Sequence, residues 1–131
     1  METLFSKIVK GDIPCYKIAE NESCFAFLDI APLAKGHVLV IPKQPVDYIF
    51  DMEDNDFSEL MLFAKKIAAA IKKAFPCPKV GMAVIGLDVP HAHVHLVPLQ
   101  QVKDLDFSRE RLQLSPADFA EIAKSIAQNL V

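Results

Sequence analysis

The clearest pattern in the chain is a stripe of apolar residues at helical spacing between about Asp54 and Phe75. Its members recur at intervals of three and four residues: Phe57, Leu60, Met61, Ala64, Ile67, Ala68 and Ile71. This spacing predicts a long amphipathic helix with one face toward a core. The sequence "PCP" follows directly, and it ends the helix because proline lacks an N–H and disfavours helical geometry in the residue before it.

Two shorter helices are expected near the ends of the chain. "TLFSKIVKG" begins with Thr3 as a possible N-cap and ends at Gly11, a residue suited to stop a helix. "SPADFAEIAKSIAQNLV" begins with Ser115 as a cap and has Pro116 at the first helical position. Both segments carry apolar residues on one side, which predicts that both helices pack against a core.

The remaining apolar segments are short and predict strands. Residues 15–20 ("CYKIAE") and 24–29 ("CFAFLD") flank the turn-prone "NES", which favours an antiparallel hairpin. Residues 37–42 ("HVLVIP") are apolar without alternation, as expected for a strand that is covered on both faces and lies centrally in its sheet. Residues 80–86 ("VGMAVIG") and 91–98 ("HAHVHLVP") are two further strands around the tight loop "LDVP".

Composition narrows the class of protein. A chain of 131 residues suits one domain, and its net charge of −3 argues against general nucleic-acid binding, so any bound phosphate must be held locally. The four glycines form no P-loop or dinucleotide-binding motif. Three cysteines without a C-x-x-C pair suggest a reducing compartment, and no apolar run approaches the ~18 residues of a membrane span. We therefore expect a cytoplasmic protein.

Three of the four histidines alternate along the last predicted strand. Side chains of a strand alternate between its faces, so His91, His93 and His95 should share one face while their neighbours pack. Three adjacent imidazoles add little packing, which makes a chemical role more plausible than a structural one. They would either ligate a transition metal, with Asp88 as a further ligand, or place one nucleophilic imidazole among neighbours that hold a phosphoryl group. The spacing alone does not decide between these two roles.

The strand "HAHVHLV" matches the signature of the histidine triad (HIT) family, in which three histidines alternate with apolar residues. "TLFSKIVKGDIP" and "CFAFLDIAPLAKGHVLVIPK" resemble two further blocks of that family in the same order, so the resemblance covers roughly Thr3 to Pro98. It implies an α+β fold with an antiparallel sheet of about five strands, one long helix and a continuous sheet across a homodimer. Residues 1–131 would form a single domain, with residues 1–98 as its core and 99–131 as a polar segment and C-terminal helix.

The resemblance also implies an activity. HIT proteins bind purine nucleotides and cleave at the α-phosphate through a covalent nucleotidyl-histidine. The chain therefore resembles a hydrolase or transferase of nucleoside phosphoramidates or of related nucleotides such as dinucleoside polyphosphates. By this analogy His93 is the nucleophile, and His91 helps to hold its tautomer. His95 would contact the phosphoryl oxygens or the leaving group, and His37 would support them from the neighbouring strand.

A nucleotide-binding set follows from the same resemblance. An apolar slot for the base, a ribose contact at Asp29 and further contacts near the phosphate would be formed by Leu4, Phe5, Ile8, Ile13, Phe27, Asp29, Ile30, Asp88 and Val89. Taken by pattern alone, several of the apolar residues would be assigned to the core, and Asp29 could simply begin the turn before Pro32. No cofactor and no metal are expected. Thr3 and Ser6 stand where other members have the C-x-x-C of a structural zinc site, so the structural zinc of those members is not expected here.

The loop before the histidines departs from the family. Leu87 and Asp88 stand where a glutamine and a hydroxyl residue would bind phosphate, and Val84 and Ile85 stand where asparagine is common. A carboxylate ~4 Å from a phosphate is repelled by ~1 kcal/mol in water and ~4 kcal/mol at a protein surface. Asp88 would therefore turn away and leave loop amides to bind phosphate, select a cationic leaving group such as an amine, or merely cap a turn. The altered loop also keeps open a nucleotide-binding regulatory module with little turnover, beside the enzyme and a histidine-ligated metalloprotein.

Overall fold

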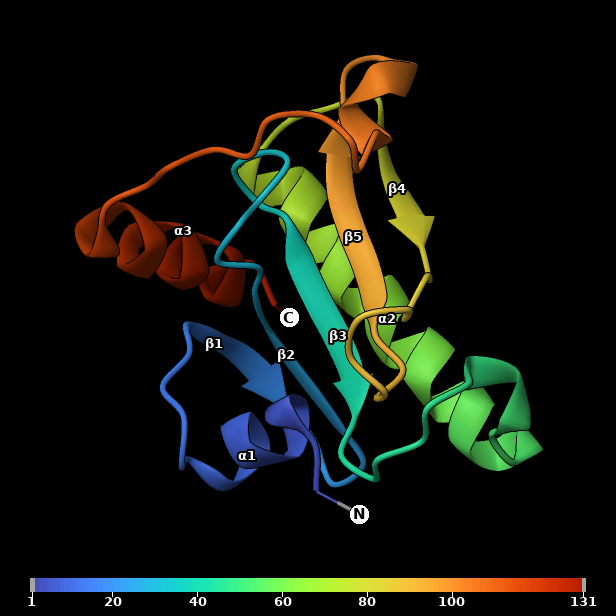
Figure 1. The fold of residues 1–131 in the computed structure, drawn as a ribbon. Coiled ribbons are helices and arrows are strands. Elements are labelled where there is room, and N and C mark those ends of the chain that lie inside the picture. Colours follow the sequence, from blue (N-terminus) through green and yellow to red (C-terminus); the bar gives the residue numbers. More distant parts are fainter. Residues whose placement is uncertain (1, 131) are drawn as a thin grey trace.

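The computed structural model of the protein describes residues 2–130 and contains one five-stranded sheet with three α-helices (Figure 1). The strand order is β1-β2-β3-β5-β4, and every neighbouring pair is antiparallel. This confirms the expected α+β class and the central position of β3. The elements in chain order are α1 Leu4–Lys10, β1 Lys17–Glu20, β2 Cys24–Leu28, β3 Val38–Pro42, α2 Asp54–Ala74, β4 Lys79–Ala83, β5 Val94–Leu99 and α3 Pro116–Gln128, with 3₁₀ turns at Ile49–Asp51 and Val102–Leu105.

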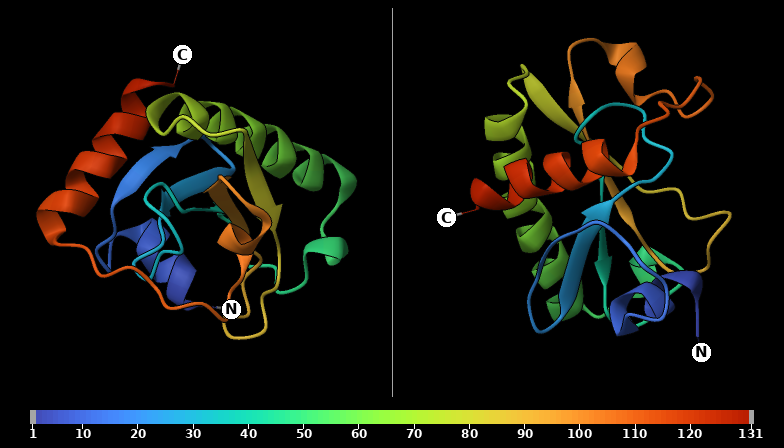
Figure 2. Two further views of the ribbon diagram at one scale, coloured as in Figure 1. Left: turned by 90° about the horizontal axis from the view of Figure 1, so that it is seen from above. Right: turned by 90° about the vertical axis from the view of Figure 1, so that its left-hand side faces the viewer.

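The two faces of the sheet are covered unequally. Alternation along the strands directs one set of side chains toward α2 and α3, where they form the larger core: Ala26, Leu28, Val38, Val40, Val94 and Leu96. The opposite set packs against α1 in a smaller cluster that includes Phe25, Phe27, Leu39 and Ile41. Viewed from above, the sheet lies between the two long helices and the short α1 (Figure 2). Because α1 has only seven residues, it covers part of its face and leaves room for a cavity.

No helix within residues 2–130 is both long enough and apolar enough to cross a membrane.

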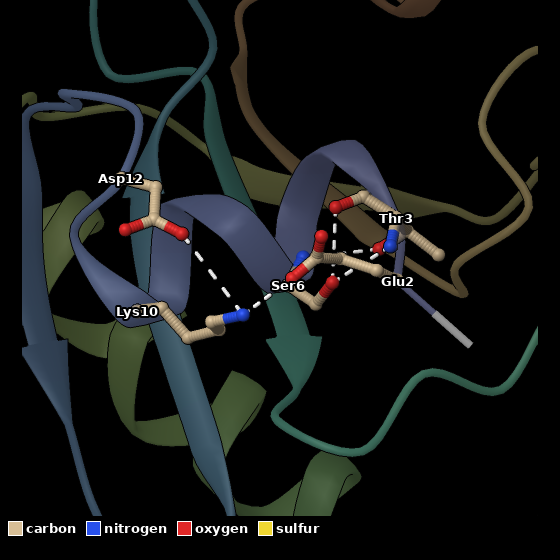
Figure 3. A network of polar contacts seen from close by, with 5 residues as sticks. All are labelled: Glu2, Thr3, Ser6, Lys10 and Asp12. Atoms are coloured by element: carbon tan, nitrogen blue, oxygen red, sulfur yellow. Dashed lines mark hydrogen bonds and ion pairs between the residues drawn. The ribbon is translucent and has the colours of Figure 1, made fainter.

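Helix α1 is fixed at both of its ends, as the sequence predicted. Thr3 Oγ1 accepts a hydrogen bond from Ser6 N at 3.0 Å, and Thr3 N donates to Ser6 Oγ at 2.7 Å, which together form a capping box (Figure 3). Gly11 ends the helix in the left-handed region at φ 86°, where a side chain would be strained. An ion pair between Lys10 and Glu2 lies beside the cap. The N-terminal segment is thereby held in place on the sheet.

The histidine strand begins later than predicted. Strand β5 starts at Val94, so His91 and His93 precede it and only His95 lies within it. The β3–β5 register, continued beyond its last pair, would place Ala92 opposite Pro42, which has no N–H to extend the ladder. The predicted alternation nevertheless persists, because Ala92 is buried in the larger core while His93 lies on the other face.

Strand β4 also differs from its predicted bounds. It ends at Ala83 rather than at Gly86, and residues 84–93 form a loop before β5. Gly86 takes a φ of 71°, a conformation that favours glycine and turns the chain back toward β5. The loop therefore stands at the rim of the face that α1 leaves open.

Candidate active site

A cavity of about 550 Å³ opens on the sheet face that carries α1. The structure brings all the predicted nucleotide-binding residues around this cavity, together with two of the histidines: Leu4, Phe5, Ile8, Ile13, Phe27, Asp29, Ile30, Asp88, Val89, His93 and His95. Apolar side chains from α1 and β2 form one wall, and the loop of residues 84–90 forms part of the rim. The arrangement suits a ligand with an apolar ring at one end and polar groups at the other.

His91 is fully buried and does not line the cavity. Its Nε2–H donates to Pro42 O at 2.7 Å, so its Nδ1 is unprotonated and accepts from the Thr3 hydroxyl at 2.7 Å. The imidazole thus joins the cap of α1 to the end of β3. We expected the His91 side chain to hold the tautomer of His93. In the structure the backbone carbonyl of His91 makes this contact instead.

The ring of His93 has a tautomer fixed by the backbone. Its Nδ1 lies 2.8 Å from His91 O, and because a carbonyl can only accept, the proton is on Nδ1. In the neutral ring the lone pair is therefore on the other nitrogen, Nε2. The ring borders the cavity and packs edge-on against Phe5, with the centroids 4.9 Å apart. These contacts fix the orientation of the His93 ring at the wall of the cavity.

His37 and His95 form a hydrogen-bonded relay with a defined direction. Leu33 N–H donates to His37 Nδ1 at 3.0 Å, so the proton of His37 is on Nε2. His37 Nε2 lies 3.0 Å from His95 Nδ1 and donates to it. The proton of His95 is then on Nε2, and since His95 lines the cavity, this N–H is available to a ligand there. One main-chain amide therefore sets the protonation pattern of two imidazoles.

Both relay histidines are uncharged at cellular pH. Burial lowers the pKa of His37 to about 3, with smaller contributions from His95 and Arg111. Burial also lowers the pKa of His95 to about 4, helped by His93 and Arg111. Burial raises the pKa of Asp29, opposed by the hydrogen bond that Asp29 Oδ1 accepts from the backbone N–H of the following turn. Asp29 Oδ2 lies 3.5 Å from His37 Nε2, but a neutral imidazole makes this a polar contact rather than an ion pair.

The histidines fit hydrogen bonding better than metal ligation. Asp29, His37 and His95 offer three possible ligand atoms within 4.8 Å of one another. A metal at that point would need a lone pair on His37 Nε2, yet this nitrogen carries the proton because Nδ1 accepts from Leu33. The oxygen atoms of Thr3 and Ser6 are engaged in the capping box, and neither residue offers a thiolate for zinc.

Two residues that border the histidines were missed from the sequence. Phe107 lies edge-on to His95 with centroids 4.7 Å apart, and the guanidinium of Arg111 lies 5.5 Å from the centroid of the Phe107 ring. Both line the cavity. They belong to the polar segment after β5, whose lack of periodicity gave no helix or strand to place them. The only available signal was an aromatic residue within the largely charged stretch "KDLDFSRER".

Asp88 is exposed at the rim of the cavity. Among residues 2–130, its carboxylate makes no hydrogen bond or ion pair, so Asp88 does not cap the turn with its side chain. The loop is instead closed by the backbone, with His91 N donating to Val89 O at 2.8 Å. Asp88 is therefore free to interact with a ligand or solvent.

Comparison with known proteins gives the family. The model of the HIT domain matches residues 10–102. The chain is 39% identical over 99 residues to adenosine 5'-monophosphoramidase hnt1 of Schizosaccharomyces pombe, covering 75% of this chain and 74% of that protein. The chain belongs to the HIT family.

Solved structures agree with this assignment. A Hit-like protein from Bartonella henselae, described as involved in cell-cycle regulation, superposes with a TM-score of 0.85 at 28% identity and covers 98% of this chain and 97% of its own. A zinc-bound histidine triad family protein from Mycobacterium smegmatis gives a TM-score of 0.84 at 28% identity, covering 99% and 94% of the two chains. The fold is thus shared along nearly the whole chain.

Proposed function

We propose that the protein hydrolyses purine nucleoside phosphoramidates, or transfers their nucleotidyl group, through a covalent intermediate on His93. The observation that carries the proposal is the 2.8 Å contact between His93 Nδ1 and His91 O, which leaves the Nε2 lone pair at the cavity. The similarity to a protein named adenosine 5'-monophosphoramidase supports this substrate class. The apolar slot beside α1 would hold the base, and Asp29 Oδ2 would accept a hydrogen bond from a ribose hydroxyl.

The reaction would proceed in two displacements. His93 Nε2 forms a bond to the α-phosphorus while the phosphorus–nitrogen bond of the substrate breaks, and its electron pair leaves with the amine, which takes a proton from solvent. Water then attacks the phosphorus, the bond to Nε2 breaks and returns its electron pair to the imidazole, and a proton leaves to solvent. The Nε2–H of His95 would stabilise negative charge on a phosphoryl oxygen in both steps. The carboxylate of Asp88 at the rim would favour a cationic amine as the leaving group.

Incubation with adenosine 5'-phosphoramidate tests the proposal. We expect AMP and ammonia as products, and an intact-mass increase equal to one adenylyl group in samples quenched during turnover. Because the site relies on imidazoles and not on a metal, a chelator should leave the rate unchanged. Binding of AMP without an adduct or turnover would instead support a regulatory nucleotide-binding module, and loss of the activity to a chelator would support the metalloprotein.

We also propose that the protein resides in a reducing compartment such as the cytoplasm, because its three cysteines are free thiols.

We further propose that two copies of the chain pair through β4. Strand β4 is an edge of the sheet. Beside β4, a groove of about 350 Å³ is lined by exposed apolar side chains, among them Phe50, Met82, Val84 and Ile85. An apolar edge of this kind suits a second copy, which would extend the sheet and bury the groove.

A charge on β4 should separate the two copies. Met82 is 54% exposed, so Met82→Lys costs the single chain little but would place an ammonium in the proposed interface. We expect sedimentation equilibrium to give a dimer for the parent and a monomer for this variant. Val102→Lys is the matched control, because Val102 is also exposed but does not line the groove. A parent that sediments as a monomer at every concentration tested would contradict the pairing.

A further inference from the structure

The segment after β5 crosses back over the histidines and is tied to the loop that follows β2. Leu112 N donates to Pro32 O at 2.9 Å, and Arg111 Nη1 donates to Ala31 O at 2.7 Å. The ring of Phe107 rests against His95 from the same side. These contacts join residues about 80 positions apart in the chain and fix the position of the Arg111 side chain beside the cavity.

The guanidinium of Arg111 is only partly satisfied within the chain. It donates to Ala31 O and, at 3.2 Å, to Phe107 O, and both partners are neutral carbonyls. A guanidinium has five N–H donors, so these two bonds leave others for a ligand. No carboxylate pairs with Arg111 among residues 2–130. Arg109 differs from Arg111 in two ways. Its Nη1 pairs with Asp104 at 3.1 Å, and its side chain does not line the cavity.

The charges around the cavity make this cation important. Among its described lining residues, Arg111 is the only lysine or arginine, whereas Asp29 and Asp88 are two carboxylates. Burial keeps His37 and His95 neutral by lowering the pKa of each. An anionic substrate that met only these groups would be repelled. The field of Arg111 reaches these groups, since it opposes the rise that burial causes in the pKa of Asp29 and adds to the lowering of the pKa of both relay histidines.

We infer that Arg111 binds a non-bridging phosphate oxygen of the substrate and so replaces the phosphate contacts that the loop of residues 84–90 lacks. Phe107 holds the guanidinium by its ring and its carbonyl. The inference rests on the proposed function and adds to it the source of phosphate affinity. In this protein the phosphate would be held by the segment after the histidines, and the positive charge of Arg111 would offset the carboxylate of Asp88.

Binding of AMP and of adenosine to Arg111→Gln separates a phosphate contact from a structural one. Glutamine keeps an N–H donor for Ala31 O but removes the charge. By isothermal titration we expect AMP to bind about 10- to 100-fold more weakly, as for the loss of a charged hydrogen bond, while adenosine binds as it does to the parent. Arg111→Lys should recover part of the AMP affinity through its point charge. Arg109→Gln, a change of the same charge in the same segment, should bind both ligands normally.

Two outcomes would overturn the inference. If Arg111→Gln binds AMP as tightly as the parent, Arg111 does not contact phosphate, and the proposed function still stands. If AMP and adenosine lose affinity equally, the arginine serves only to position the segment. A parent that binds no nucleotide at all would contradict the proposed function itself, and the inference with it.

Discussion

Replacement of His93 by glycine should reduce phosphoramidate turnover by about 10⁴-fold or more, because it removes the proposed nucleophile and not merely a contact to the substrate. The side chain is 8% exposed and borders the cavity, so its loss opens space beside Phe5 instead of exposing the main core. AMP should still bind, since the base slot and Arg111 remain. Steady-state rates and intact-mass detection of the adenylyl adduct measure the effect.

Free imidazole supplies a control for this variant. A small imidazole that enters the space left in His93→Gly can attack the same phosphorus, so added imidazole should restore part of the turnover without forming a protein adduct. The same addition should not affect the parent. Turnover by His93→Gly within tenfold of the parent rate, or an adduct that persists in the variant, would show that another group is the nucleophile.

The second large effect is a loss of stability on mild acidification. The pKa of His37 is about 3 and that of His95 about 4 in the folded state, whereas an unfolded histidine titrates near ~6.5. Between these pKa values the unfolded chain binds more protons than the folded chain. The stability that the two histidines contribute is therefore complete above pH ~6.5 and decreases as the pH falls below it. From about pH 7.5 to about pH 5.5, each of these two residues should lower the free energy of unfolding by about 1.4 kcal/mol. The lowered pKa of His91 acts in the same direction.

Urea unfolding at both pH values measures this loss. In His37→Leu the difference between the two pH values should shrink by about 1.4 kcal/mol, whatever the absolute stability of the variant. Ile41→Val, a change at a fully buried position without a titrating group, should lower stability equally at both pH values. A parent whose free energy of unfolding is the same at both pH values would rule out neutral buried imidazoles in the relay.

Local sequence patterns predicted most of the helices and strands, because caps, stops and periodic stripes depend on residues that are close together in the chain. The cap at Thr3, the stop at Gly11 and the long stripe of α2 all involve residues within a few positions of each other. The start of β5 could not be found in this way, because it depends on Pro42 in another strand, whose missing N–H ends the ladder. Sequence order alone does not reveal which residue a strand will meet.

The candidate site was predictable in part for the same reason. Alternation placed His93 and His95 on one face, and the family resemblance named the apolar slot that the structure gathers around the cavity. The contribution of Arg111 depends on a contact with Ala31 that joins an irregular segment to a distant turn. The two contacts of His91 could not be predicted from the sequence either. Its carbonyl accepts from His93, and its ring accepts from Thr3 at the cap of α1.

The imidazoles of His93 and His95 are oriented ultimately by main-chain groups, the carbonyl of His91 and the amide of Leu33. Proline at position 33 would remove the N–H, but no other replacement of a side chain at positions 33 or 91 deletes those groups. Substitutions at the rim, in the loop of residues 84–90 and in the segment after β5 therefore leave in place the main-chain groups that orient the two imidazoles. Substitutions at the rim could change the leaving group without altering the main-chain groups that orient the proposed nucleophile.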